Sequence, residues 1–172
     1  TGTFDLEALA GYAPPNWAVA CILAGILSKS ATFPLHSWLP DAGVAPSPVT
    51  ALLHAAVLVK IGVYAYVQLF VVTFDIDGLW TAVVPTVAAL SALISAGCAL
   101  VSTDIKRVVA YSTISQLAFI LLGISCGTRT GLVGGMLYIL THSVAKAGLF
   151  LCCGIVEHAL HTKDMSKMGG LI

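Results

Sequence analysis

Long apolar runs separated by short polar stretches dominate the pattern of this chain. Because a helix that crosses a bilayer needs about 20 mostly apolar residues, the pattern predicts about five membrane-spanning helices. The predicted helices cover residues 17–39, 49–72, 79–101, 105–126 and 132–156. Helix-breaking stretches, such as Asp77-Gly78 and Gly127-Thr128, lie between them. We therefore expect an all-α membrane protein, a polytopic helix bundle that forms a single transmembrane domain over residues 1–172.

The first predicted helix contains a proline, Pro34, that favours a break inside it. Proline removes a backbone N–H donor and crowds the carbonyl four residues earlier, here that of Ser30. The side chains of Ser28, Ser30 and Thr32 offer hydrogen bonds to the freed backbone groups. Broken helices at membrane depth face protein or water, and transporters use them as ion sites. Two interpretations stay open, an ion site at the break or a plain proline kink.

Composition and charge narrow the class of protein. The 172 residues are 58% hydrophobic and 9% charged, whereas soluble domains carry about 25% charged residues. The net charge is zero and no basic run occurs, which argues against a nucleic-acid partner. Five cysteines lie in apolar stretches without C-x-x-C spacing, so we interpret them as buried hydrophobic side chains. His158 and His161 beside Glu157 lack the H-E-x-x-H spacing, and we expect no metal site.

The distribution of Lys and Arg over the loops predicts an orientation. The loops on one side hold Arg129, and those on the other hold Lys106, Arg107, Lys163 and Lys167. The rule that positive loops face the cytoplasm makes 1–16 an extracytoplasmic loop and 157–172 a cytoplasmic loop. We expect a multi-pass protein of the inner (cytoplasmic) membrane or its organelle equivalent. Because the chain lacks an initial Met and a signal peptide, we expect an internal fragment of a longer protein.

Three lysines, Lys29, Lys60 and Lys146, lie inside predicted spans. A lysine near the centre of a spanning helix costs roughly 2.5–3.5 kcal/mol on insertion scales, so each needs compensation. Snorkelling suits helix ends better than these positions. The lysines therefore serve either an ion pathway, which we favour, or structural ion pairs. No carboxylate lies inside any predicted span, so a buried glutamate partner would have to come from another helix.

The last predicted helix places three polar side chains on one face. Tyr138, His142 and Lys146 are spaced by four residues, one helical turn apart. A lone histidine in a membrane is more often a satisfied hydrogen-bonding group than a relay. With a lysine one turn away, proton transfer becomes the favoured interpretation, since histidine titrates near neutral pH. On the second helix, His54 and Lys60 are six residues apart and point to different faces.

The fourth predicted helix carries a polar face that includes Ser112 and Gln116, four residues apart. Together with Tyr138, these side chains are candidates for ordering water along an ion pathway. Hydrogen bonding between adjacent helices is the equal alternative. Asp104 opens the same helix, where a carboxylate suits the N-terminus and offsets the cations that follow.

Four motifs occur in order along the chain: Lys29–Asp41 (KSATFPLHSWLPD), Ala45–His54 (APSPVTALLH), Thr103–Gln116 (TDIKRVVAYSTISQ) and Thr141–Phe150 (THSVAKAGLF). In this order they resemble the antiporter-like membrane subunits of respiratory complex I (NADH:quinone oxidoreductase). The same family includes Mrp-type cation/proton antiporters and energy-converting membrane hydrogenases. The resemblance covers the chain from about Leu23 onward.

The resemblance implies a fold with two inverted five-helix repeats, each with one broken helix, of which this chain would hold helices seven to eleven. Lys29 matches the lysine of the broken seventh helix, which pairs with a glutamate on the fifth. His54 or Lys60 matches the eighth-helix link, and Lys146 with His142 matches the central eleventh-helix group. Tyr138 departs from members that have a second histidine there, and Lys60 occurs in only some branches.

The function that the resemblance implies is that of a proton-translocating subunit of a quinone-reducing respiratory complex, coupled to electron transport. The alternatives are a Mrp-type Na⁺/H⁺ antiporter subunit, an ion-pumping subunit of a membrane-bound hydrogenase, and a structural subunit. No redox motif occurs, so we expect no cofactor and no redox site in this chain. The expected partners are other membrane subunits of a translocase complex, the lipid bilayer, and H⁺ or Na⁺.

Overall fold

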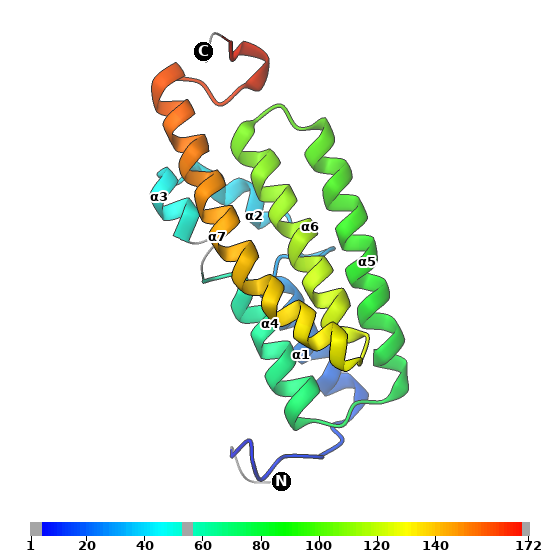
Figure 1. The fold of residues 1–172 in the computed structure, drawn as a ribbon. Helices are drawn as coiled ribbons and strands as arrows, with labels where there is room; N and C mark the ends of the chain where they lie inside the picture. The colour runs from blue at the N-terminus through cyan, green and yellow to red at the C-terminus, as the bar shows by residue number, and fades with distance from the viewer. Residues whose placement is uncertain (1–4, 53–56, 170–172) are drawn as a thin grey trace.

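The computed structural model describes residues 5–52 and 57–169, which form a helical bundle (Figure 1). In chain order the elements are α1 (Asn16–Lys29), α2 (Trp38–Asp41), η1 (Ala42–Val44), α3 (Ser47–Thr50), α4 (Lys60–Tyr66), η3 (Val67–Thr73), α5 (Gly78–Val101), α6 (Ile105–Ser125), α7 (Arg129–Leu160) and η4 (Met165–Lys167). Among the described residues, β structure is limited to two isolated bridges. The predicted all-α architecture is confirmed.

The helices α5, α6 and α7 form the main layer of the bundle and run side by side (Figure 1). They contain 24, 21 and 32 residues and are apolar and long enough to cross a membrane. The middle helix, α6, is the most buried of the three. Large apolar side chains such as Leu93, Val144 and Ile155 point outward and stay exposed in the described chain, as surfaces that face lipid or other membrane helices do.

The first predicted span is broken near its middle, because α1 ends before the proline. The segment that follows α1 contains Pro34 and is not helical until Trp38 opens α2. The hydroxyl of Ser30 donates to the Ile26 carbonyl at 2.8 Å, and the Trp38 indole N–H donates to the Ser28 carbonyl at 3.0 Å. These side chains add a second hydrogen bond to each carbonyl, because Ile26 O also accepts the backbone N–H of Ser30 at 2.9 Å and Ser28 O that of Ala31 at 3.2 Å.

The second predicted span, residues 49–72, is not one continuous α-helix. It is divided into α3, α4 and the π-helix η3, and residues 53–56, including His54, lie outside the described residues. Pro46 and Pro48 fix the start of α3 two residues earlier than predicted. The widened turns of η3 end where the Thr73 hydroxyl donates to the Gln68 carbonyl at 2.8 Å. The two shorter apolar pieces, α1 and 60–73, are below the length of a full span.

Backbone hydrogen bonds tie the loops together at both ends of the bundle. At the N-terminal end, Gly11 N–H donates to the Thr73 carbonyl at 2.8 Å. At the opposite end, Ile105 N–H donates to the Lys163 carbonyl at 3.0 Å. The second contact joins the start of α6 to the segment after α7. It gathers four cations at one end of the bundle: Lys106, Arg107, Lys163 and Lys167.

Two glycines allow helices to approach closely. A Cβ atom at Gly62 would lie 2.7 Å from the Ile26 carbonyl oxygen, so α4 packs with its backbone directly against the end of α1. A Cβ atom at Gly154 would collide with the side chain of Ser47, so α3 sits directly on α7. Glycine at these positions therefore fixes how the short helices are placed against the long ones.

Candidate functional site

Lys146 lies near the middle of α7 and is 5% exposed. Its Nζ donates to the Ser112 hydroxyl at 2.7 Å and lies 3.5 Å from the Val109 carbonyl, both on α6. None of the ion pairs formed by the described residues includes Lys146. The amine is therefore held by neutral acceptors, which solvate it without fixing its charge.

His142 lies one turn before Lys146 on the same face of α7 and is 3% exposed. Neither ring nitrogen has a hydrogen-bond partner among the described residues. The ring lies edge-on to Tyr138, with centroids 6.2 Å apart. Tyr138 in turn donates its hydroxyl to Gln116 Oε1 on α6. The predicted stacking of Tyr138, His142 and Lys146 thus forms one wall of a site whose other wall is α6.

A cavity of about 240 Å³ opens between these two walls. Its lining residues are Ser112, Gln116, Tyr138, Thr141, His142, Ala145 and Lys146. Every residue proposed to order water lines it, and so do the histidine and lysine of α7. The volume has room for several water molecules, and the polar lining supplies hydrogen-bond partners for them.

Lys60 reaches the same region from α4. It is 6% exposed, and its Nζ has no hydrogen-bond partner among the described residues. Both Lys60 and Lys146 lie near enough to the His142 ring for their charges to interact with it. The structure therefore brings three of the predicted pathway residues, Lys60, His142 and Lys146, into one neighbourhood on two helices.

Lys29 differs from the three residues of that group in its exposure. It is the last residue of α1 and is exposed in the described chain. It lies just before the break that contains Pro34, and Gly62 brings the start of α4 against this end of α1. Within the described residues, no ion pair includes Lys29. The prediction for His54 falls outside the described residues and has no structural account.

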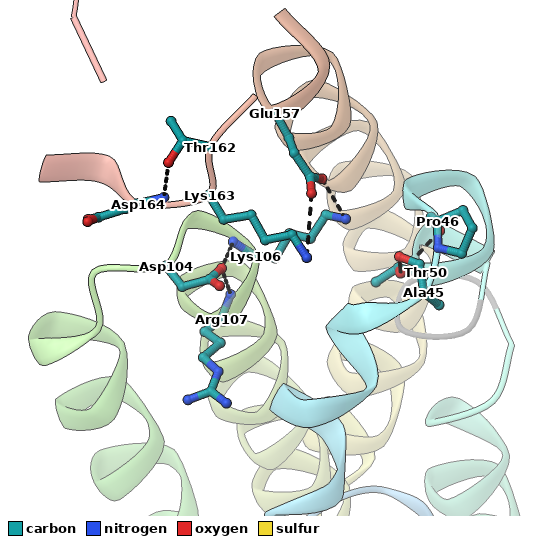
Figure 2. A network of polar contacts seen from close by, with 10 residues as sticks. All are labelled: Ala45, Pro46, Thr50, Asp104, Lys106, Arg107, Glu157, Thr162, Lys163 and Asp164. Atoms are coloured by element: carbon teal, nitrogen blue, oxygen red, sulfur yellow. Dashed lines mark hydrogen bonds and ion pairs between the residues drawn. The ribbon is translucent and has the colours of Figure 1, made fainter. Parts of the chain in front are cut away.

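A second polar cluster, which the sequence did not predict as a site, lies at the end of the bundle that carries the cations (Figure 2). Lys106, treated as a loop cation in the prediction, is 3% exposed, and its Nζ lies 2.7 Å from Glu157 Oε2. Lys163 approaches the other oxygen of Glu157 at 3.5 Å. The spacing of Lys106 and Glu157 in the sequence gives no sign of the pair, because it forms between two helices.

The start of α6 orients this cluster. Asp104 Oδ1 accepts the backbone N–H groups of Lys106 at 2.8 Å and Arg107 at 3.1 Å, which is the N-cap that the sequence predicted (Figure 2). Nearby, the rings of His158 and His161 lie 6.2 Å apart. Across the described ranges, no group of three or more His, Cys, Asp or Glu residues could hold a metal ion.

Comparisons with known proteins agree on one family. The family profile described as "NADH:quinone oxidoreductase/Mrp antiporter, TM" matches residues 1–172. The NAD(P)H-quinone oxidoreductase subunit 5 of the Paulinella chromatophora chromatophore is 39% identical over 170 residues, which cover 91% of this chain and 25% of that protein. A probable K(+)/H(+) antiporter protein of Rhizobium meliloti is 37% identical over 177 residues, which cover 99% of this chain and 18% of that protein.

The solved structure of the Mrp complex from Dietzia sp. DQ12-45-1b gives the same answer for the fold. One of its chains matches with a TM-score of 0.83 and 33% sequence identity, over 91% of this chain and 30% of that one. The chain spans a quarter or less of the length of the two curated relatives described above. It is membrane-embedded, and it belongs to the NADH:quinone oxidoreductase/Mrp antiporter transmembrane family.

Proposed function

We propose that this chain is part of a membrane subunit that translocates protons along Lys60, His142 and Lys146. The observation that carries the proposal is the setting of Lys146, a buried amine held by a hydroxyl and a carbonyl beside a polar cavity. An amine with only neutral acceptors can release a proton without leaving a buried carboxylate unpaired. That property suits a carrier of protons better than a structural ion pair.

Proton movement along this group follows from repulsion between like charges. Like charges in a setting of low dielectric repel one another, so a proton on one of these buried groups opposes a second proton on its neighbour. Charge therefore moves in steps, each triggered by a change at a neighbour. Water in the cavity between Lys146, Ser112 and the Tyr138–Gln116 pair would carry the proton across the gaps.

In the same proposal, Lys29 and His54 lie at the entrance of the proton pathway. Lys29 stands at the end of a broken helix, and transporters use such ends to bind ions. Its glutamate partner would come from a helix outside this chain, and His54 would link the break to the central group. Energy from a redox partner, or from an opposing ion gradient, would act by shifting the charge beside Lys29.

The proposed setting is a subunit of a quinone-reducing respiratory complex, in contact with other membrane subunits. An ion/proton antiporter is the second candidate, supported by the comparable identity to the two relatives, 39% and 37%. In either setting this chain would bind no redox cofactor, and electron transfer would take place in other subunits. The gathering of four cations at one end supports an orientation with Ile172 on the cytoplasmic side and Thr1 on the opposite side.

Lys146→Ala in the complete protein tests the proposal. We expect proton transport by membrane vesicles to be abolished, while the amount of assembled protein in the membrane stays unchanged. Lys167→Ala is the matched control, because Lys167 is an exposed lysine at the end of the bundle. Normal transport by a fully assembled Lys146→Ala variant would leave the lysine with a structural role only.

A further inference from the structure

Along its buried face, α7 carries polar side chains near its middle, apolar ones beyond the middle, and a polar one again near its end. His142 and Lys146 are followed on the same face by Phe150, Cys153 and Glu157, at intervals of four, three and four residues. Eleven residues separate Lys146 from Glu157, which corresponds to about 16 Å along a helix. Two polar groups on one face are therefore separated by an apolar interval.

That interval is filled by a cluster of buried side chains, which we call the Phe150 layer: Ala51, Val109, Ala110, Phe150 and Cys153. Phe150 and Ala110 are fully buried, and the other three are at most 9% exposed. On α6 the layer occupies positions between Lys106 and Ser112, and on α7 between Lys146 and Glu157. The layer thus lies between the two polar clusters on both helices.

Cavities lie on both sides of this layer. The 240 Å³ cavity includes Ser112 and Lys146. A larger cavity, of about 1050 Å³, lies at the cationic end and includes Lys106, Glu157 and Lys163. None of the five residues of the Phe150 layer lines either cavity. Two cavities with ionisable groups in their walls are therefore separated by a single apolar layer.

The third wall of the layer comes from the short helix α3. Ala51 follows α3 directly, and Gly154 lets Ser47 of α3 rest on the backbone of α7. The Thr50 hydroxyl bonds back to the Ala45 carbonyl at 3.0 Å and holds this short turn together (Figure 2). The wall is therefore built from the local contacts of one short helix with α7.

We propose that the Phe150 layer is a hydrophobic gate between the Lys146 site and the Lys106–Glu157 pair. The inference rests on the proposed function, in which protons reach Lys146 through water. Apolar constrictions stop conduction by excluding water, and Phe150 supplies most of the apolar bulk here. The conformation described is the closed state, in which the ion pair of Lys106 with Glu157 holds the ends of α6 and α7 together. Opening the layer would join the two cavities into one aqueous path to the cationic end.

Cys153 provides a reporter inside the layer, because it is 4% exposed. The complete protein is prepared in membrane vesicles with Cys153 as its only cysteine, and a small water-soluble methanethiosulfonate reagent is added. Phe150→Ala is expected to raise the rate of Cys153 modification about tenfold, since water enters the layer by local opening. The same variant is expected to increase passive proton leak in vesicles without an energy source. Phe119→Ala, which removes an exposed aromatic side chain from α6, should change neither rate.

A second variant keeps the test valid if Phe150→Ala fails to fold. Ala110→Ser adds one hydroxyl to the layer with little change in volume, and it should also speed modification of Cys153. The gate is overturned if Cys153 reacts as fast in the parent as an exposed thiol, or if neither variant changes its rate. Modification of Cys153 can be measured without transport. The proton pathway and the gate can therefore be contradicted independently of each other. If the Lys146→Ala variant still transports protons, the proposed proton pathway is wrong, but the Phe150 layer can still exclude water. If Lys146→Ala is inactive and Phe150→Ala leaves the rate of Cys153 modification unchanged, only the proposed gate is wrong.

Discussion

Lys106 and Lys146 are both buried lysines at the interface of α6 with α7, yet their surroundings differ in one respect. Lys106 faces the carboxylate of Glu157 at 2.7 Å, whereas Lys146 faces the hydroxyl of Ser112 at the same distance. Their exposed fractions, 3% and 5%, are nearly equal. Burial alone therefore does not distinguish them, and the charge of the partner does.

The difference separates a group that holds the fold from one that can change its charge. Removing Glu157 would leave the buried amine of Lys106 as an unpaired charge, which is destabilising. A proton that leaves Lys146 strands no carboxylate, because its acceptors are neutral in either state. We infer that the pair of Lys106 with Glu157 is built for stability and that Lys146 is built for exchange.

The largest effect on stability is expected from Lys106→Met. The substitution keeps the volume of the side chain but leaves Glu157 with Lys163 alone, at 3.5 Å. We expect the free energy of unfolding to fall by about 2 kcal/mol, between the costs of a buried and an exposed pair, because Glu157 is 25% exposed. Thermal unfolding of the purified protein in detergent measures the change. The double variant Lys106→Met with Glu157→Gln should recover most of the loss, and failure of that rescue would contradict the assignment of the pair.

Ser112→Ala comes next and should act on transport more than on stability. It removes the short hydrogen bond to the Lys146 amine, and a hydrogen bond to a charged group is worth about 1.5–3 kcal/mol. We expect the rate of proton transport to fall about tenfold or more. Ser125→Ala is the control, because in the described part of the chain its hydroxyl bonds to one carbonyl of its own helix, that of Leu122. Equal effects of the two alanines would remove Ser112 from the pathway.

Asp104→Ala should have a smaller effect, confined to the start of α6. The carboxylate caps the N–H groups of Lys106 and Arg107, and the loss of such a cap costs about 1 kcal/mol. Asp104→Asn keeps an N-cap acceptor and should retain most of the stability. Thermal unfolding distinguishes the two variants, and an asparagine as damaging as the alanine would argue against capping as the cause.

The smallest change in stability is expected from Lys146→Met, which pairs directly with the first prediction. Methionine fills a similar volume and removes a buried charge that has no acid partner among the described residues. We expect the free energy of unfolding to change by no more than about 0.5 kcal/mol, although transport is lost. A destabilisation as large as that of Lys106→Met would erase the distinction between the two lysines.

Local signals in the sequence account for most of what was predicted correctly. The bounds of α5 and α6 differ from the predicted ranges by one residue at most, because polar breakers flank uniform apolar runs. The stacking of Tyr138, His142 and Lys146 followed from helical periodicity alone. The division of 49–72 was not predicted, because this stretch contains no proline and Gly62 as its one glycine.

Neither the burial of Lys106 nor the existence of the Phe150 layer was predicted, because both depend on contacts between helices. The spacing of residues within one helix does not encode such contacts. Lys106 looked like a loop cation because it follows Asp104 in a polar stretch. Its partner, Glu157, lies 51 positions later in the sequence and reaches it only because α7 packs along α6. Likewise, Phe150 looked like one more apolar residue of a membrane span until its neighbours on α6 were known.

The length of α7 has a mechanical consequence. Thirty-two residues give a rod of about 48 Å, whereas the oily part of a bilayer is about 30 Å thick. The rod must lean, protrude, or do both, and either way its last turn reaches the headgroup zone. Its midpoint falls at residues 144–145, next to Lys146. One unbroken helix therefore connects Glu157, near the protruding end, with the Lys146 amine at mid-membrane depth.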